Sequence, residues 1–161
     1  MGLVARDLMQ RDVRSVSPKM SLTDLERTFC DAGQSGFPVV ADGKRLVGVV
    51  SRTDVVRKLA ALQSYAEYES GYYWDMSDPN APTPSLEDLG VRVGARLDGL
   101  CVEDVMSHAP ITVTGDTAIR DLARILIERG IHRLPVVEGG ALVGILTSTD
   151  LVRLIAEGKL G

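Results

Sequence analysis

Two carboxylates follow a hydroxyl side chain at the same spacing: Asp54 comes three residues after Ser51, and Asp150 comes three residues after Thr147. Each pair stands between an apolar run and an amphipathic one, which indicates the start of a helix. A carboxylate there can accept hydrogen bonds from two neighbouring sugar hydroxyls. The hydroxyl and the unpaired N–H groups of a first helical turn suit a phosphate. The alternative is that both residues only cap the helix, and spacing alone favours this second role.

Other reactive side chains are few and scattered. The chain has two histidines, and neither Cys30 nor Cys101 lies in a Cys-x-x-Cys pair or beside a histidine. This excludes a zinc site and favours two buried thiols, with one disulfide between them as the alternative. The sequence contains no recognisable Ser-His-Asp or Cys-His arrangement, Gly-rich phosphate loop or acidic metal cluster. We therefore expect neither catalysis nor a bound metal.

Charge and hydropathy limit the partners of the chain. Its net charge is −4 and it has no run of Lys and Arg, so we expect no nucleic acid. No apolar run approaches the ~20 residues that span a bilayer. The first residues lack the signals for secretion and myristoylation. We expect a cytoplasmic protein that does not bind membranes.

The two carboxylate motifs belong to a repeat. Two segments return 97 residues later with the same residue types, Asp7-Leu8-Met9 as Asp104-Val105-Met106 and Pro38-Val39-Val40 as Pro135-Val136-Val137. The offset then falls to 96, because the turn 41–44 corresponds to the shorter turn 138–140. A turn tolerates a deletion best. The chain therefore consists of two similar copies.

The pattern of each copy predicts a short extended stretch, a helix, two strands and a helix. In copy two the apolar residues between Ala118 and Gly130 recur with helical spacing; Thr117 or Asp116 can cap this helix, and Gly130 can end it. Two apolar runs around a glycine turn predict a buried hairpin, and a last helix follows near Thr149. The copy-one elements are an extended stretch at 14–16, strands at 37–40 and 46–50, and a helix from residue 53.

A unit of about 55 residues is marginal alone, so we expect the two copies to bury their sheet faces together. The predicted fold is α/β, with two β-α-β-β-α repeats packed sheet-to-sheet about a pseudo-two-fold axis and a cleft between them. We place domain one at 1–60, an aromatic and proline-rich insert at 61–100, and domain two at 101–161. The insert holds all four tyrosines and the only tryptophan. It is expected to cover the core, contact a partner or second subunit, or close over a ligand.

These features together resemble a tandem pair of cystathionine β-synthase (CBS) domains over about two thirds of the chain. The marks are Asp-x-Met, a helix that ends in glycine, the Pro-Val-Val strand, and a motif of Gly, two apolar residues, Ser or Thr, two further residues and Asp. That motif is weak alone and strong as two copies in register, at 48–54 and 144–150. The resemblance implies a non-catalytic sensor that binds AMP, ADP, ATP or S-adenosylmethionine between the repeats, forms a homodimer and regulates another protein.

The resemblance also implies roles for the residues around the second motif. Asp150 would bind the ribose, and Thr147 and Arg133 the phosphate, because a planar guanidinium fits phosphate oxygens. His132 would also contact the ligand, and the alternative is that it only stacks on a neighbour or caps a helix.

The adenine base would lie against residues of copy two. The backbone around Thr112 would read the edge of the base, and Val136 with the neighbouring Pro135 would enclose its ring.

Copy one departs from this pattern at two positions. Its Ser51 and Asp54 match the motif, but Gly36 stands where copy two has Arg133, and Ser35 stands where it has His132. A charge-assisted contact is worth roughly 1.5–3 kcal/mol, about tenfold to a hundredfold in affinity. We expect unequal sites, with the site around Asp150 the stronger.

Two other classes of function stay open on the sequence. One is a structural dimerisation module whose clefts hold no ligand. The other is an enzyme fragment, since similar domains occur in inosine monophosphate dehydrogenase, although a catalytic barrel needs ~200 residues or more. Neither the adenosyl ligand nor the regulated protein can be named from the residues.

Overall fold

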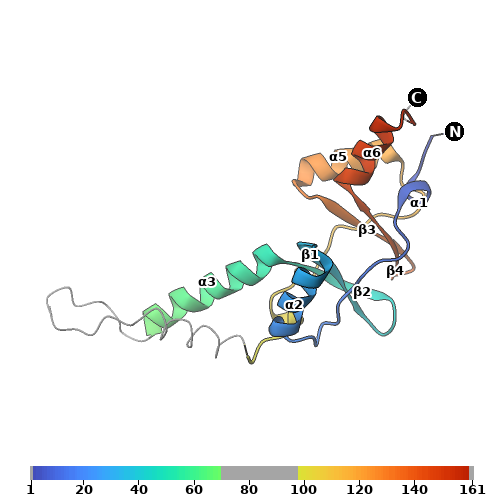
Figure 1. Cartoon of the computed structure of the whole chain (residues 1–161). Coiled ribbons are helices and arrows are strands. Elements are labelled where there is room, and N and C mark those ends of the chain that lie inside the picture. Colours follow the sequence, from blue (N-terminus) through green and yellow to red (C-terminus); the bar gives the residue numbers. More distant parts are fainter. Residues whose placement is uncertain (1, 70–97, 160–161) are drawn as a thin grey trace, which may run out of the picture. The chain divides into compact units, whose positions relative to one another are not determined.

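The computed structural model describes residues 2–69 and 98–159 (Figure 1). Its elements are, in chain order, α1 (Ala5–Leu8), α2 (Leu22–Ala32), β1 (Gly36–Ala41), β2 (Arg45–Ser51), α3 (Arg52–Glu69), the 3-10 helix η1 (Val102–Asp104), α5 (Ile119–Arg129), β3 (Arg133–Glu138), β4 (Ala141–Thr147) and α6 (Ser148–Ala156). Both copies therefore contain a helix, two strands and a helix, and the predicted α/β class with two repeats is confirmed.

The four strands form one sheet in the order β1-β2-β4-β3. β3 and β4 are antiparallel, with Arg133 opposite Thr147 at one end and Glu138 opposite Ala141 at the other. β2 meets β4 where Arg45 lies opposite Ala141. The sheet thus joins a hairpin from each copy.

The extended stretch that opens each copy is reduced to a single bridge. Val16 forms a parallel bridge with Val39, and Val113 forms the same bridge with Val136. Each bridge has two backbone hydrogen bonds of 2.9–3.1 Å. The two copies thus attach their first stretch to the Pro-Val-Val strand in the same way.

The chain divides into two compact units that do not coincide with the copies. Unit 1 consists of Met1–Ser17, Pro38–Val49 and His108–Gly161, and unit 2 of Pro18–Phe37 and Val50–Ser107. Each unit therefore combines parts of both copies.

In unit 1 the leading segment of copy one, residues 3–10, pairs with the start of α5. The Ala5 amide donates to the Thr117 carbonyl at 2.8 Å, and the Ile119 amide donates to the Leu3 carbonyl at 3.1 Å. Copy one thus completes a helix start in copy two.

In unit 2 the leading segment of copy two, residues 100–107, pairs with the start of α2. The Val102 amide donates to the Met20 carbonyl at 2.9 Å, and the Leu22 amide donates to the Leu100 carbonyl at 3.3 Å. These four residues correspond to those of unit 1 through the 97-residue offset. The copies therefore exchange their leading segments reciprocally, which is why the units cut across the repeat.

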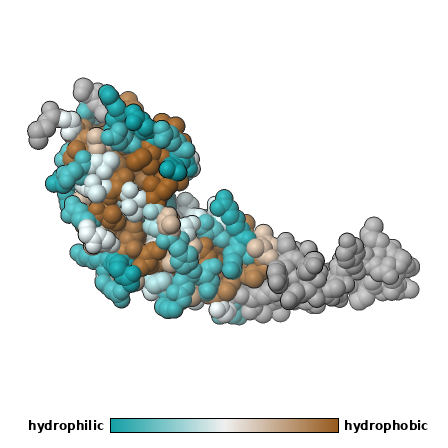
Figure 2. Space-filling model, turned by 180° about the vertical axis from the view of Figure 1, so that it is seen from behind, coloured by the Kyte–Doolittle hydropathy of each residue, from teal (hydrophilic) through white to brown (hydrophobic). Residues whose placement is uncertain are grey.

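The surface of the described chain carries apolar side chains among hydrophilic ones (Figure 2). The most exposed large apolar residues of unit 1 lie on α5 and α6: Ile127 is 81% exposed, Ile155 66% and Val152 63%. No helix within 2–69 or 98–159 has the length and apolar character needed to cross a bilayer.

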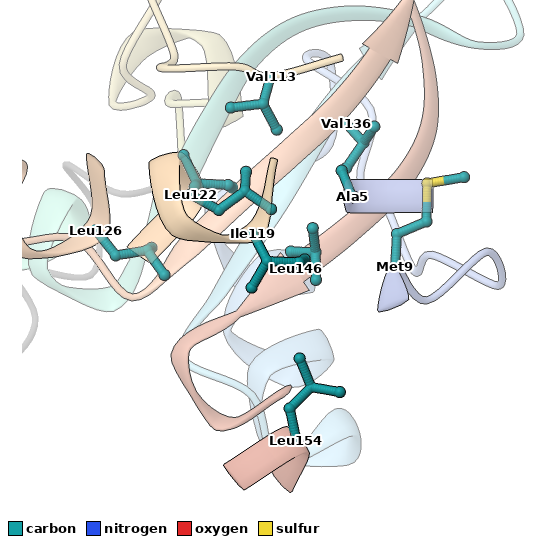
Figure 3. Close-up of a cluster of buried hydrophobic side chains, with 10 residues drawn as sticks. Ala5, Met9, Val113, Ile119, Leu122, Leu126, Val136, Leu146 and Leu154 are labelled. Atoms are coloured by element: carbon teal, nitrogen blue, oxygen red, sulfur yellow. The ribbon is translucent and has the colours of Figure 1, made fainter. Parts of the chain in front are cut away.

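The core of unit 1 lies between α1, α5, α6 and the β3–β4 hairpin (Figure 3). Its buried residues are Ala5, Met9, Val113, Ile119, Leu122, Leu126, Leu134, Val136, Leu146 and Leu154. Met9 packs so closely on β4 that a Cβ atom at Gly144 would lie 2.5 Å from its sulfur. The Asp-x-Met motif thus supplies a core residue that requires glycine at 144.

Unit 2 is built on α2. This helix buries Leu25 and Phe29, and the ring of Phe29 stacks on Phe37 with 5.4 Å between the centroids. The guanidinium of Arg52 lies 5.5 Å from the centroid of the Phe29 ring, within the range of a cation–π contact. The start of α3 is thereby fixed to α2.

The predicted cap of α5 was wrong. Its N-cap is Ala118, which offers no side-chain acceptor. Thr117 accepts from the Thr114 amide at 3.2 Å, and Asp116 pairs with Arg6 at 2.5 Å, so neither predicted residue caps the helix. The end was predicted correctly, because Gly130 closes α5 with φ 59°.

Part of the insert lies outside the described residues. α3 extends to Glu69, so it includes Tyr65 and Tyr68 as expected. Tyr72, Tyr73, Trp74 and the proline-rich stretch fall in the part that is not described. The role of the insert and the division at 1–60, 61–100 and 101–161 stay predictions.

Candidate functional site

The motif of copy two forms the turn from β4 into α6. The Thr147 hydroxyl accepts from the Asp150 amide at 3.2 Å, and Asp150 Oδ2 accepts from the Thr147 amide at 2.8 Å and from its hydroxyl at 2.7 Å. This is a reciprocal capping box. One oxygen of Asp150 therefore serves the helix start, as the capping alternative predicted.

The other oxygen of Asp150 is bound by a residue of the leading segment of copy one. Gln10 Nε2 donates to Oδ1 at 3.1 Å and lies 3.4 Å from Oδ2. Two backbone hydrogen bonds of 2.9 and 3.0 Å join Gln10 to Ile145 of β4 and hold it in place. Arg153 Nη1 lies 3.6 Å from Oδ1, and the Asp150 side chain is only 5% exposed. Asp150 is thus a nearly buried carboxylate with protein partners on both oxygens.

Asp150 also lines a hollow of about 450 Å³ between α1 and α6. Its other lining residues are Leu3, Asp7, Leu8, Arg153, Leu154, Glu157 and Lys159. Lys159 binds Glu157 at 2.7 Å, and this hydrogen bond lowers the pKa of the Glu157 carboxyl. Neither Thr147 nor Arg133 lines this hollow, so it is not the whole of the predicted groove.

Two of the predicted ligand residues lie beside the motif. Arg133 begins β3 directly opposite Thr147, which puts a guanidinium on the strand next to the capping box. His132 is exposed, and its carbonyl accepts from the Ser148 amide at 3.0 Å. The structure therefore brings the Thr147–Asp150 turn and the His132–Arg133 pair together.

The other two predicted residues lie farther along the strands. Pro135 is buried and faces Ile145 across the hairpin. Thr112 is exposed and precedes Val113, which bridges Val136. Neither Pro135 nor Thr112 is a hydrogen-bond partner of Asp150, and their roles toward a base stay predictions.

The motif of copy one has the same cap. Asp54 Oδ2 accepts from the Ser51 amide at 2.8 Å and from its hydroxyl at 2.7 Å, and the Ser51 hydroxyl accepts from the Asp54 amide at 3.2 Å. Arg57 Nη1 is 4.0 Å from Oδ1, and the Asp54 side chain is 16% exposed. The position that corresponds to Gln10 is Ser107, which has no carboxamide. Copy one therefore lacks the contact that covers Asp150.

Gln10 was not among the site residues predicted from the sequence. It is 140 residues away from Asp150 in the chain and has no like residue in copy two, so the repeat gave no reason to single it out. The reciprocal exchange of leading segments is the signal that places it there.

The two cysteines are both free thiols in unit 2, so they form no disulfide. Cys30 is exposed, which contradicts the expected burial. The Cys101 thiol donates to Asp104 Oδ2 at 3.2 Å, and this hydrogen bond raises the pKa of the thiol. Within the described ranges, no group of three or more His, Cys, Asp or Glu side chains could hold a metal.

Comparison with known proteins agrees with the geometry. The chain is 30% identical over 161 residues to the CBS domain-containing protein CBSX2, chloroplastic, of Arabidopsis thaliana, a match that covers 98% of the chain and 66% of CBSX2. It is 26% identical over 152 residues to the protein MJ1225 of Methanocaldococcus jannaschii, covering 94% of the chain and 42% of MJ1225. The chain thus spans less than two thirds of the length of either relative.

A crystal structure of CBSX2 in complex with AMP superposes with a TM-score of 0.70 at 28% identity, and the match covers 98% of this chain and 99% of that one. The family model of the CBS domain matches residues 5–61 and 102–157. These two matches coincide with the two copies found in the sequence. The chain belongs to the CBS domain family and carries the domain twice.

Proposed function

We propose that the chain is a regulatory module without chemistry of its own, which binds an adenine nucleotide at Asp150 and alters the activity of a partner protein. AMP, ADP or ATP is the ligand. The observation that carries this proposal is the environment of Asp150, a nearly buried carboxylate whose Oδ1 is held by a displaceable amide. The AMP complex of CBSX2, at 28% identity, supports the ligand class.

The ribose would take the place of the Gln10 amide. Gln10 Nε2 donates to Oδ1 of Asp150 at 3.1 Å, as a ribose hydroxyl can. A buried carboxylate that lost this donor without replacement would be costly. Gln10 therefore satisfies Asp150 in the empty site, and the ribose satisfies it in the occupied one.

The phosphate would bind mainly to Arg133. The Thr147 hydroxyl both donates to and accepts from Asp150, so a phosphate would have to open the capping box to use it. Arg133 lies directly opposite Thr147 and offers a planar fork for phosphate oxygens. The positive end of the α6 dipole adds to the attraction.

Gln10 also connects ligand binding to the fold. Its backbone is part of the leading segment that completes the start of α5. Release of its side chain by a nucleotide would remove one of the attachments of that segment. A partner protein that recognises this segment would then bind the empty and occupied forms differently.

We further propose that the module forms a homodimer. The exposed Ile127, Val152 and Ile155 on α5 and α6 support a contact there, because apolar residues are enriched at the centre of subunit interfaces. The cytoplasmic location is also a proposal, and the name of CBSX2 gives the chloroplast for that relative.

Isothermal titration of the protein with AMP tests the nucleotide site. The matched variants are Asp150→Asn and Asp54→Asn, because both alter an identical capping box. We expect Asp150→Asn to weaken AMP binding at least tenfold and Asp54→Asn to change it less than twofold. Equal weakening in both variants would contradict a site restricted to Asp150.

Thermal shift assays with AMP, ADP, ATP and S-adenosylmethionine separate the alternatives. A ligand at 100 times its Kd adds about 2.7 kcal/mol of stability. A rise in melting temperature with S-adenosylmethionine alone would show that this compound, and not a nucleotide, is the ligand. No shift with any of the four would favour a structural module.

A further inference from the structure

A second hollow of unit 1, also about 450 Å³ in volume, lies at the opposite end of β4 from Thr147. It is lined by Leu142 and Val143 of β4, by Val40, Gly43 and Lys44 around the turn from β1 to β2, and by Arg11, Val13 and Ser15. It shares no lining residue with the hollow at Asp150. It is therefore a separate feature from the proposed nucleotide site.

The charged residues of this hollow are Arg11 and Lys44, and no carboxylate lines it. In the described part of the chain, neither cation takes part in an ion pair. The acid nearest to Lys44 in sequence, Asp42, is bound by Arg45 at 2.7 Å. Arg11 Nη2 donates to the Arg6 carbonyl at 3.3 Å, which leaves its other N–H groups for a ligand.

Lys44 is held at the edge of the hollow by its backbone. Its amide donates to the Asp42 carbonyl at 3.1 Å, and its carbonyl accepts from the Leu142 amide at 2.8 Å. Asp42 and Gly43 have φ of 48° and 80°, so the turn is tight and left-handed. The ammonium group thus extends from a fixed backbone position beside the apolar wall.

Both cations belong to copy one alone. Lys44 corresponds to Gly140 of copy two, because the Leu142 amide donates to the Lys44 carbonyl and the Leu46 amide donates to the Gly140 carbonyl. Arg11 corresponds to His108. The positive charge of this hollow is therefore not part of the repeated fold.

We propose that this hollow binds a small organic dianion, a phosphate monoester or a dicarboxylate with a short apolar body. Arg11 and Lys44 supply charge-assisted donors to the anionic oxygens, and the hydroxyl of Ser15 is a further donor. Val13, Val40 and Leu142 form apolar walls for the body of the ligand. The hollow has no acid to receive ribose hydroxyls, so its ligand differs from that of the Asp150 site.

Titration of the ¹⁵N-labelled chain with phenyl phosphate tests this proposal, with the chemical shifts of the backbone amides as the readout. We expect saturable shifts at residues 11–15 and 40–44. The double variant Arg11→Gln/Lys44→Gln should weaken binding at least tenfold. Arg14→Gln is the matched control, because it removes an exposed cation of the same segment that does not line the hollow, and it should change the Kd less than twofold.

Phenylmalonate carries two carboxylates and the same phenyl ring, so a titration with it distinguishes the two ligand classes. The probe that binds more tightly shows whether the hollow prefers a phosphate monoester or a dicarboxylate. The titration is repeated in Asp150→Asn, where binding should persist and so stands independently of the nucleotide site. No saturable shift with either probe would overturn the proposal. Equal weakening by Arg14→Gln and the double variant, or shifts confined to the surroundings of Asp150, would also overturn it.

Discussion

The two copies begin their last helix with the same capping box, yet they surround its carboxylate differently. The Asp54 side chain is 16% exposed, and Arg57 Nη1 lies 4.0 Å from its Oδ1. Asp150 is 5% exposed, and Gln10 covers its second oxygen. The repeated motif thus encodes a helix start, and the residues outside it decide how its carboxylate is surrounded.

The same contrast holds elsewhere in the chain. The cores and the exchange of leading segments follow the repeat, whereas Gln10, Arg133 and Lys44 have no like residue in the other copy. Shared positions therefore build the fold, and unshared positions are the candidates for a difference in function between the two copies. Changes at paired positions test this division directly.

Truncation of the paired core residues should have the largest effect. Leu25 of α2 and Leu122 of α5 are 97 residues apart and both 0% exposed. Leu25→Ala and Leu122→Ala should each lower the free energy of unfolding by about 2–5 kcal/mol, as measured by urea denaturation. A cost below about 1 kcal/mol for either would show that the two cores are not equivalent.

Removal of the amide that covers Asp150 should affect binding next most. Gln10→Ala should tighten AMP binding about tenfold in isothermal titration, because the nucleotide no longer displaces a hydrogen bond to a charged group. Ser107→Ala alters the corresponding residue of copy two and should leave the affinity unchanged. Weaker AMP binding by Gln10→Ala would instead make Gln10 a ligand contact.

The helix caps of the two copies differ by one residue, and exchanging it should have a moderate effect. The Ser21 hydroxyl accepts from the Asp24 amide at 3.1 Å at the start of α2, whereas α5 has Ala118 at this position. Ser21→Ala should lower the free energy of unfolding by about 1 kcal/mol, and Ala118→Ser should raise it by roughly 0.5–1 kcal/mol. Guanidinium denaturation measures both. A loss of stability in Ala118→Ser would show that this helix start has no place for a hydroxyl.

The smallest effect is expected at the start of η1. The Cys101 amide and the Cys101 thiol both donate to the Asp104 carboxylate, and they lower the pKa of this carboxyl, the amide having the larger effect. The corresponding residue of copy one is Val4, which has no thiol. Cys101→Val removes only the thiol, so the pKa of Asp104 should rise part of the way to its ordinary value. A carboxyl ¹³C titration by NMR measures this shift. An unchanged pKa would show that the backbone amide acts alone.

The sign of the linked stability follows from the lowered pKa. The contribution of Asp104 is present above its unfolded pKa of about 3.9 and is lost as the pH falls through the lower folded value. The difference in unfolding free energy between the wild type and Cys101→Val should therefore narrow below about pH 4. A difference that grew on acidification would contradict this.

Much of the fold could be predicted from the sequence because the repeat made each element visible twice. The strands predicted at 37–40 and 46–50 are each longer by one residue at both ends, and Gly130 ends α5 as expected. The cap of α5 was missed because Thr117 and Asp116 have partners of their own in the loop.

The candidate site was predicted only in part. The Thr147–Asp150 turn and the nearby Arg133 were identified, because their types and spacing are local to one hairpin and one helix. Gln10 was not, since its contact depends on a pairing between residues 140 apart. A pattern within one copy carries no information about which segment the other copy contributes.

The exchange of leading segments also bears on how such a chain arose. A polypeptide with one copy would leave the amides at the start of its own helix without the carbonyls that the other leading segment provides. Two identical polypeptides can satisfy each other by trading these segments, as a domain-swapped dimer does. Joining them end to end makes that association intramolecular and no longer dependent on concentration. In a fused chain each half can change in sequence without the other, so a symmetric scaffold can carry one-sided chemistry.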